Sequence, residues 1–225
     1  MNAKLTASLL ILAAVLANVG FTALGSNFNY PDVLDEPAGA VLADFRANEG
    51  AVSAWFTVLA LSAALMAPIA IGVGRLSSSR AMRIAVRVGI AAAVVQVIGL
   101  LRWPILVPGY AADGNADAFS TASDILGTAI GETLGYLLTA TWTVLVIVAL
   151  GRRYAGRWFQ VLGAGSAALV LAGVLSPLGL PVIDTANFFG YVLWSLWLIA
   201  FAVVILVRER RAAAPATLST SAVAS

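Results

Sequence analysis

The sequence contains no cysteine and no histidine, and its single lysine is Lys4, close to the first residue. Without cysteine the chain can form no disulfide, iron–sulfur cluster or thiolate zinc site. Without histidine it lacks the usual haem and metal ligands and the base of the common hydrolase triads. No lysine lies inside an apolar segment, so a Schiff base to a cofactor is excluded there. We therefore expect no cofactor and no metal, and we do not expect an enzyme.

Charged residues are scarce as well. They make up 11% of the 225 residues, and hydrophobic residues make up 61%, whereas about a quarter of the residues in a soluble domain are charged. A helix needs roughly 20 predominantly apolar residues to cross a bilayer. Six stretches meet this length: 5–24, 51–73, 84–107, 125–150, 159–180 and 187–207. The sequence therefore predicts an all-α fold, a polytopic membrane bundle of about six transmembrane helices, within residues 1–211.

The positions of the basic residues predict the orientation of this bundle. Of 13 lysine and arginine residues, 11 precede the first span, follow the last, or lie in or next to the second-to-third and fourth-to-fifth connections. Most acidic residues lie in the other connections. Cytoplasmic loops carry the excess of basic residues, so we expect both termini in the cytoplasm. The net charge of +2 then reflects topology, and we expect no nucleic-acid partner.

Three segments outside the main spans need separate interpretation. The first span could be a cleaved signal peptide, but its apolar run is longer than the roughly 7–15 residues of a signal core, so we expect a retained helix. In the external loop 26–50, Pro37 and the spacing of the apolar residues after it indicate a short amphipathic helix. That helix lies either on the membrane surface or over the mouth of the bundle. Residues 212–225 are rich in Ala, Ser and Thr, which predicts a disordered cytoplasmic tail.

Two pairs of spans share a sequence pattern. Gly135-Tyr136 with Trp142 in the fourth span recurs as Gly190-Tyr191 with Trp197 in the sixth span. Gly89 and Gly99 in the third span have the same separation as two glycines in the fifth span. The pattern suggests parallel repeats of two hairpins, as in some transporters. Chance similarity between apolar helices is the alternative.

Arg87 lies near the start of the third predicted span, and two charged residues lie deeper inside spans, Arg102 in the third and Glu132 in the fourth. A charge at the bilayer centre costs about 2.5–3.5 kcal/mol on insertion scales, so such residues usually face the bundle interior and are paired. Both fall in the outer half of adjacent antiparallel helices, where a pair is feasible. Arg102 could instead extend to the outer headgroups, whereas the shorter Glu132 cannot. We expect the two residues to form either a functional or an architectural centre.

The fourth span has two distinct faces. Gly127, Gly131 and Gly135 form small-xxx-small steps that favour close helix packing. Polar residues, including Glu132 and Tyr136, follow the neighbouring face, and the sixth span has a shorter polar stripe. Hydrogen bonding between helices explains most of these Ser, Thr and Asn residues. The candidate ligand-binding residues are Arg102, Glu132, Tyr136, Asn187 and Tyr191.

Four motifs resemble a known family. They are Phe28-Asn29-Tyr30-Pro31-Asp32-Val33-Leu34, Gly99-Leu100-Leu101-Arg102-Trp103-Pro104, Gly131-Glu132-x2-Gly135-Tyr136-Leu137-Leu138 and Gly190-Tyr191-Val192-Leu193-Trp194-Ser195-Leu196-Trp197. Together they are similar to the domain-of-unknown-function family 4386, bacterial multi-pass membrane proteins. The resemblance spans all six predicted helices and implies the plasma membrane of a bacterium. It implies no activity.

Two hypotheses for function remain. The first is that the protein binds or transports a small solute or a lipid at a polar intramembrane site. The second is that it is a structural or regulatory subunit that packs against another membrane protein or a second copy of itself. An intramembrane enzyme would depend on Glu132, the only carboxylate inside a span.

Overall fold

The computed structural model describes residues 2–213 of the protein, and these residues contain helices but no strand. Within them, six helical segments are long and apolar enough to cross a membrane: Ala3–Phe28, Glu49–Leu76, Arg80–Asp113, Ala116–Leu150, Arg157–Leu178 and Val182–Ala212. The predicted all-α polytopic bundle is therefore confirmed. Most of the tail predicted to be disordered lies outside the described residues, and its first two residues end the last helix.

The spans consist of one or several consecutive helices. Their bounds are α1 Ala3–Phe28, α3 Glu49–Ala64 and α4 Met66–Gly74, α5 Arg80–Ile105 and α6 Val107–Asp113, α7 Ala116–Ala122, η2 Ser123–Leu134 and α8 Gly135–Leu150, α10 Arg157–Ala172 and η3 Gly173–Leu178, and α11 Pro181–Ala213. Here η2 is a π-helix and η3 a 3₁₀-helix. The short connecting helices are η1 Asp32–Asp35, α2 Ala38–Ala47 and α9 Arg152–Ala155.

Polar caps extend several helices beyond the apolar runs seen in the sequence. The hydroxyl of Ser79 accepts a hydrogen bond from the backbone N–H of Met82 at 3.2 Å and starts α5. The side chain of Asn115 accepts one from Ala118 at 3.0 Å and starts α7. Such caps satisfy backbone donors that have no partner inside the helix. The third and fourth spans therefore begin earlier than residues 84 and 125.

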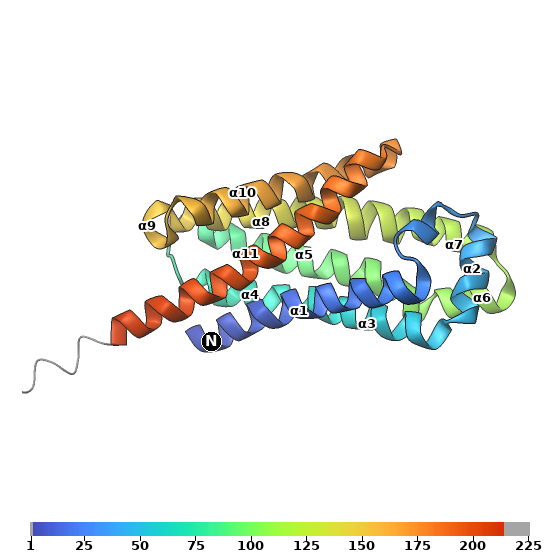
Figure 1. Ribbon diagram of the computed structural model, residues 1–225, viewed down its shortest axis with the longest axis horizontal. Helices are drawn as coiled ribbons and strands as arrows, with labels where there is room; N and C mark the ends of the chain where they lie inside the picture. Colours follow the sequence, from blue (N-terminus) through green and yellow to red (C-terminus); the bar gives the residue numbers. More distant parts are fainter. Residues whose placement is uncertain (1, 214–225) are drawn as a thin grey trace, which may run out of the picture.

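The six spans form a closed ring. Each span packs against the next along the chain, and α11 also packs against α1. The first and last helices bring both described chain ends to one end of the bundle, called here the terminus end (Figure 1). Helices α2, α6 and α7 lie at the opposite end, called here the cap end. Helix α11 runs obliquely across the other helices between the two ends (Figure 1).

Two separate hydrophobic clusters fill the ring. The terminus-end cluster draws buried side chains from all six spans, with Trp142, Trp197 and Phe201 among the largest. The cap-end cluster joins the first three spans, the third through both α5 and α6, to η1, α2 and α7. In it Trp103 stacks on Phe56, with ring centroids 4.6 Å apart and planes at 6°. The apolar core is therefore divided along the length of the bundle.

Helix α2 covers the cap end of the ring. Its apolar residues Val41, Leu42 and Phe45 are at most 2% exposed and belong to the cap-end cluster. The helix packs against α6, α7 and α3. The sequence left two positions open for this helix, the membrane surface and the mouth of the bundle. The structure has α2 over the mouth of the bundle, because its apolar face is covered by protein.

Candidate polar site between the two hydrophobic clusters

Arg102 lies near the cap end of α5 and is only 6% exposed. Its Nη1 donates a 2.6 Å hydrogen bond to the carbonyl oxygen of Gly99, one turn closer to the terminus end. The guanidinium carbon lies 5.2 Å from the centre of the Trp103 ring. The buried Nε has no hydrogen-bond partner within residues 2–213. The side chain thus folds back into the bundle instead of extending to the headgroups, and it keeps an unused donor.

Glycines make this arrangement possible. A Cβ on Gly127 would lie 2.6 Å from Nη2 of Arg102, so a larger residue at this position would have to displace the guanidinium. A Cβ on Gly131 would lie 2.9 Å from Cα of Gly99, and one on Gly135 would lie 3.0 Å from Cγ of Gln96. Of the three glycines predicted to pack helices, Gly131 meets a backbone and the other two meet polar side chains.

Glu132 lies in the π-helix η2, one turn beyond Gly127. In a π-helix the hydrogen bonds join residues five apart, so residues 127 and 132 lie on the same face, beside Arg102. Glu132 is half-buried. Across residues 2–213 its carboxylate has no hydrogen bond and no ion pair within 4.0 Å. Its charge interacts electrostatically with Arg102 and Asp184. The two membrane charges are therefore neighbours without direct contact.

Two tyrosines continue the site from α8 to α11. The rings of Tyr136 and Tyr191 lie 5.7 Å apart at 62°. The side chain of Thr139 forms a hydrogen bond with Tyr191 and accepts one from Nε2 of Gln96 at 2.7 Å. This network joins α5, α8 and α11 on the terminus-end side of Arg102 and Glu132, between the two hydrophobic clusters. We call Arg102, Glu132, Tyr136, Tyr191 and their hydrogen-bonded neighbours the polar layer.

Asn187 lies at the edge of the polar layer. Its Nδ2 donates a 2.8 Å hydrogen bond to the carbonyl oxygen of Val170 in α10. A Cβ on Gly173 would collide with this amide and would lie 2.6 Å from Cδ2 of Tyr136. The amide group of Asn187 therefore fastens α11 to α10, while the residue remains close to Tyr136.

Tyr30 belongs to the site but was not among the predicted residues. It lies in the loop after α1, where its ring packs edge-on against Phe56 with centroids 5.3 Å apart. Burial raises the pKa of its hydroxyl, and the negative charge of Glu132 raises that pKa further. The only sequence signal was its presence in the motif Phe28–Leu34 shared with the resembled family. No helical periodicity connects that loop with residues 102 and 132.

The two hairpins that share a sequence pattern also share a contact. A Cβ on Gly89 would lie 2.8 Å from Cδ1 of Trp142, and one on Gly163 would lie 2.6 Å from Nε1 of Trp197. The two indole rings meet edge-on, with centroids 5.8 Å apart. Toward the cap end the hairpins differ, because one has the charges of the polar layer there and the other has Asn187.

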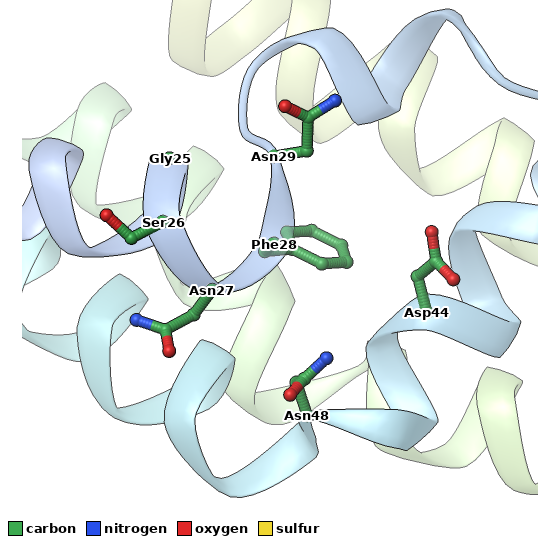
Figure 2. A pocket seen from close by; sticks show the side chains of 7 residues that line it. All are labelled: Gly25, Ser26, Asn27, Phe28, Asn29, Asp44 and Asn48. Carbon is green, nitrogen blue, oxygen red and sulfur yellow. The ribbon is translucent and has the colours of Figure 1, made fainter.

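A second polar feature lies at the cap end, in a cavity of about 320 Å³. Residues at the ends of α1 and α2 line it: Gly25, Ser26, Asn27, Phe28, Asn29, Asp44 and Asn48. Figure 2 shows Asp44 and Asn48 beside Phe28. Asp44 is the only charged residue in this lining. Among residues 2–213 no group of three or more His, Cys, Asp or Glu side chains could hold a metal ion.

The model of a family described as "Domain of unknown function (DUF4386)" matches residues 5–202. The chain belongs to this family. The match includes every residue of the polar layer as well as Tyr30, so in this DUF4386 protein the charges inside the membrane lie within the family's own domain. The resemblance inferred from the four motifs is confirmed. Comparison with curated proteins and with solved structures finds no significant match.

Proposed function

We propose that this protein binds or transports a small polar solute or a lipid headgroup at the polar layer. The observation that supports the proposal is the state of Arg102 and Glu132. Arg102 is buried and has a free Nε donor, and the carboxylate of Glu132 has no protein partner in residues 2–213. A ligand between them would give a hydrogen-bond or charge partner to both groups.

An architectural role would be expected to look different. Charges inside a membrane are costly, and a purely structural pair normally compensates the cost through direct hydrogen bonds. Here Arg102 bonds to a backbone carbonyl and leaves Glu132 free. The geometry therefore favours a site that is completed by a ligand.

The surrounding helices support binding that involves movement. π-Helices are rare, and many occur at functional sites. Helix η2 carries Glu132 and crosses α5 at the Gly99–Gly131 contact, which has no side chains to interlock. Two hairpins with equivalent glycine–tryptophan contacts are an internal repeat, a feature that many transporter folds have.

The proposed setting is the plasma membrane of a bacterium, with the terminus end in the cytoplasm. The support is the charge asymmetry of the sequence, because the arginines flanking the spans concentrate at the terminus end. In this orientation the polar layer and α2 lie toward the outer surface.

The alternative role as a subunit of a membrane complex has less support. The glycine face of the fourth span was one reason to consider it, since small residues favour helix association. In the structure Gly127, Gly131 and Gly135 face α5 of the same chain. That face is therefore already covered and offers no surface to a partner.

Mass spectrometry of co-purifying small molecules and lipids tests the proposal. The full-length protein and its Glu132→Gln variant would be extracted in mild detergent and compared. A species present with the wild type and depleted in the variant is the expected result. Identical contents in two equally folded preparations would contradict a ligand site at Glu132 and would favour the subunit role.

A further inference from the structure

We infer that the ligand of the polar layer is a zwitterion, with an anionic group at Arg102 and an ammonium group at Glu132. This inference rests on the proposed function and adds the chemical class of the ligand. Arg102 supports the anionic group of the ligand, and Glu132 supports the ammonium group.

The anion half is indicated by the guanidinium of Arg102. Arginine binds phosphate and carboxylate groups through several donors at once. One donor, Nη1, is occupied by the carbonyl of Gly99, and Nε is buried without a partner in the part of the chain that the structure describes. The guanidinium lies directly against η2 at Gly127, where a Cβ would be 2.6 Å from Nη2.

The cation half is indicated by Glu132 and the aromatic rings near it. Its carboxylate has no cationic partner within 4.0 Å in the described part of the chain. Tyr136, one helical turn further on, forms an edge-on pair with Tyr191. The charge of Glu132 also acts on Tyr30. A carboxylate with tyrosine rings in its neighbourhood is a suitable environment for primary or quaternary ammonium groups.

The separation of the two charges points to one ligand that carries both. Arg102 and Glu132 interact electrostatically but form no ion pair within 4.0 Å. A single anion would lie against Glu132 and be repelled, and a single cation would be repelled by Arg102. A zwitterion with its charges separated by a short linker avoids both repulsions. The same chemistry occurs in a free solute and in a zwitterionic lipid headgroup.

Binding of matched probes to the purified full-length protein tests this inference. Glycerophosphoethanolamine carries both charges, glycerol phosphate only the anion and ethanolamine only the cation. We expect the zwitterion to bind at least about tenfold more tightly than either single-charge probe, since a charge-assisted contact is commonly worth that factor. Calorimetric titration in detergent gives the three dissociation constants.

A second arm distinguishes the two sources of the ligand. The protein would be placed in nanodiscs of phosphatidylglycerol with or without phosphatidylethanolamine, and retained lipid would be measured by native mass spectrometry. Retention of phosphatidylethanolamine, without binding of the soluble probe, supports a lipid headgroup. Binding of the soluble probe supports a free solute.

Charge variants identify the side chain that binds each charged group of the ligand. Glu132→Gln is expected to bring the affinity for the zwitterion close to that for glycerol phosphate. Arg102→Gln is expected to bring it close to that for ethanolamine. Arg46→Gln and Glu49→Gln, both exposed at the cap end, are matched controls and should keep the preference. Tyr136→Leu should weaken ethanolamine binding more than Tyr136→Phe, which retains an aromatic face.

The failure of this inference differs from the failure of the proposed function. If glycerol phosphate binds as tightly as the zwitterion, and Glu132→Gln leaves that ratio unchanged, the zwitterion is wrong although a ligand site exists. If no probe binds and wild type and Glu132→Gln co-purify with the same molecules, both proposals are wrong.

Discussion

The smallest feature on which the polar layer depends is a missing side chain. Arg102 can fold back toward Gly99 only because position 127 is glycine, and Glu132 lies beside it only because η2 is a π-helix. In α-helical register, residues 127 and 132 would lie on different faces, since side chains three or four apart share a face. The local helix type therefore determines which residues are neighbours.

Gly127→Ala is expected to displace the guanidinium of Arg102. The new Cβ would lie 2.6 Å from Nη2, and such overpacking typically costs about 1–3 kcal/mol. Thermal unfolding in detergent should show lower stability, and mass spectrometry should show less co-purified ligand. Gly109→Ala is the matched control, because nothing lies within 4 Å of its Cβ position. Equal behaviour of the two variants would contradict this account of Gly127.

Tyr30 predicts a pH dependence at alkaline pH. Its pKa is raised in the folded protein by burial and by Glu132, whereas an unfolded tyrosine ionises near about 10. A raised folded pKa means that the folded state holds the proton more tightly. The resulting stability is present below about pH 10 and is lost as pH rises toward the folded pKa.

The stability of Tyr30→Phe should therefore fall less steeply than that of the wild type above about pH 10. Denaturant titrations at several alkaline pH values measure this difference. Glu132→Gln should show an intermediate slope, because it removes only the second cause of the shift. Parallel pH profiles for all three proteins would show that Tyr30 is not coupled to stability.

At the scale of helices, α5 and η2 cross backbone against backbone beside the polar layer. A Cβ on Gly99 would lie 2.6 Å from Cα of Gly131, and the reverse distance is 2.9 Å. Both obstacles are backbone atoms, which cannot move aside as the end of a side chain can. The two helices must separate to accept any larger residue.

Gly131→Ala should destabilise the protein by about 1–3 kcal/mol through forced separation of these helices. Denaturant titration in detergent measures the loss. Gly165→Ala in α10 meets nothing within 4 Å and should be neutral or slightly stabilising, because alanine favours helix more than glycine does. A neutral Gly131→Ala would mean that the crossing is looser than the structure indicates.

Phe45 connects α2 to the rest of the cap end. It is fully buried and packs against Phe28 and Trp103, with ring centroids 6.5 and 6.0 Å apart. Phe45→Ala should cost about 3–5 kcal/mol and should increase proteolysis in the loop around α2. Phe188→Ala, at a position 57% exposed, is the control that should change neither property.

At the scale of the whole molecule, the ring of six spans places the chain ends and the cap on opposite sides. The absence of cysteine makes the sidedness easy to measure, because an introduced thiol has no background. Ser78 lies between the second and third spans, and Ala112 lies at the cap end; both are exposed.

We expect an impermeant thiol reagent applied to intact cells to label Ala112→Cys and not Ser78→Cys. Both variants should be labelled after the cells are opened, which controls for accessibility. The opposite pattern would reverse the orientation derived from the basic residues. It would also place the polar layer toward the cytoplasm.

Properties that depend on local free energy were readable from the sequence. Apolar runs long enough to cross a bilayer determine the six spans, because the free energy of inserting a segment into the membrane depends mainly on the residues of that segment. The same reasoning selected Arg102 and Glu132, because a charge inside such a run is costly wherever it lies. The family resemblance followed from short motifs that lie within single segments.

The tertiary structure decided what local energetics cannot. The fit of Arg102 onto Gly127 and the electrostatic coupling of Tyr30 to Glu132 both depend on segments far apart in the sequence. The π register of η2 was likewise not indicated by any sequence pattern. The same holds for α2, whose apolar face could have been covered by lipid or by protein. Sequence alone thus determined which groups must avoid lipid. Packing determined which of them face one another, because that depends on how the helices close into a ring.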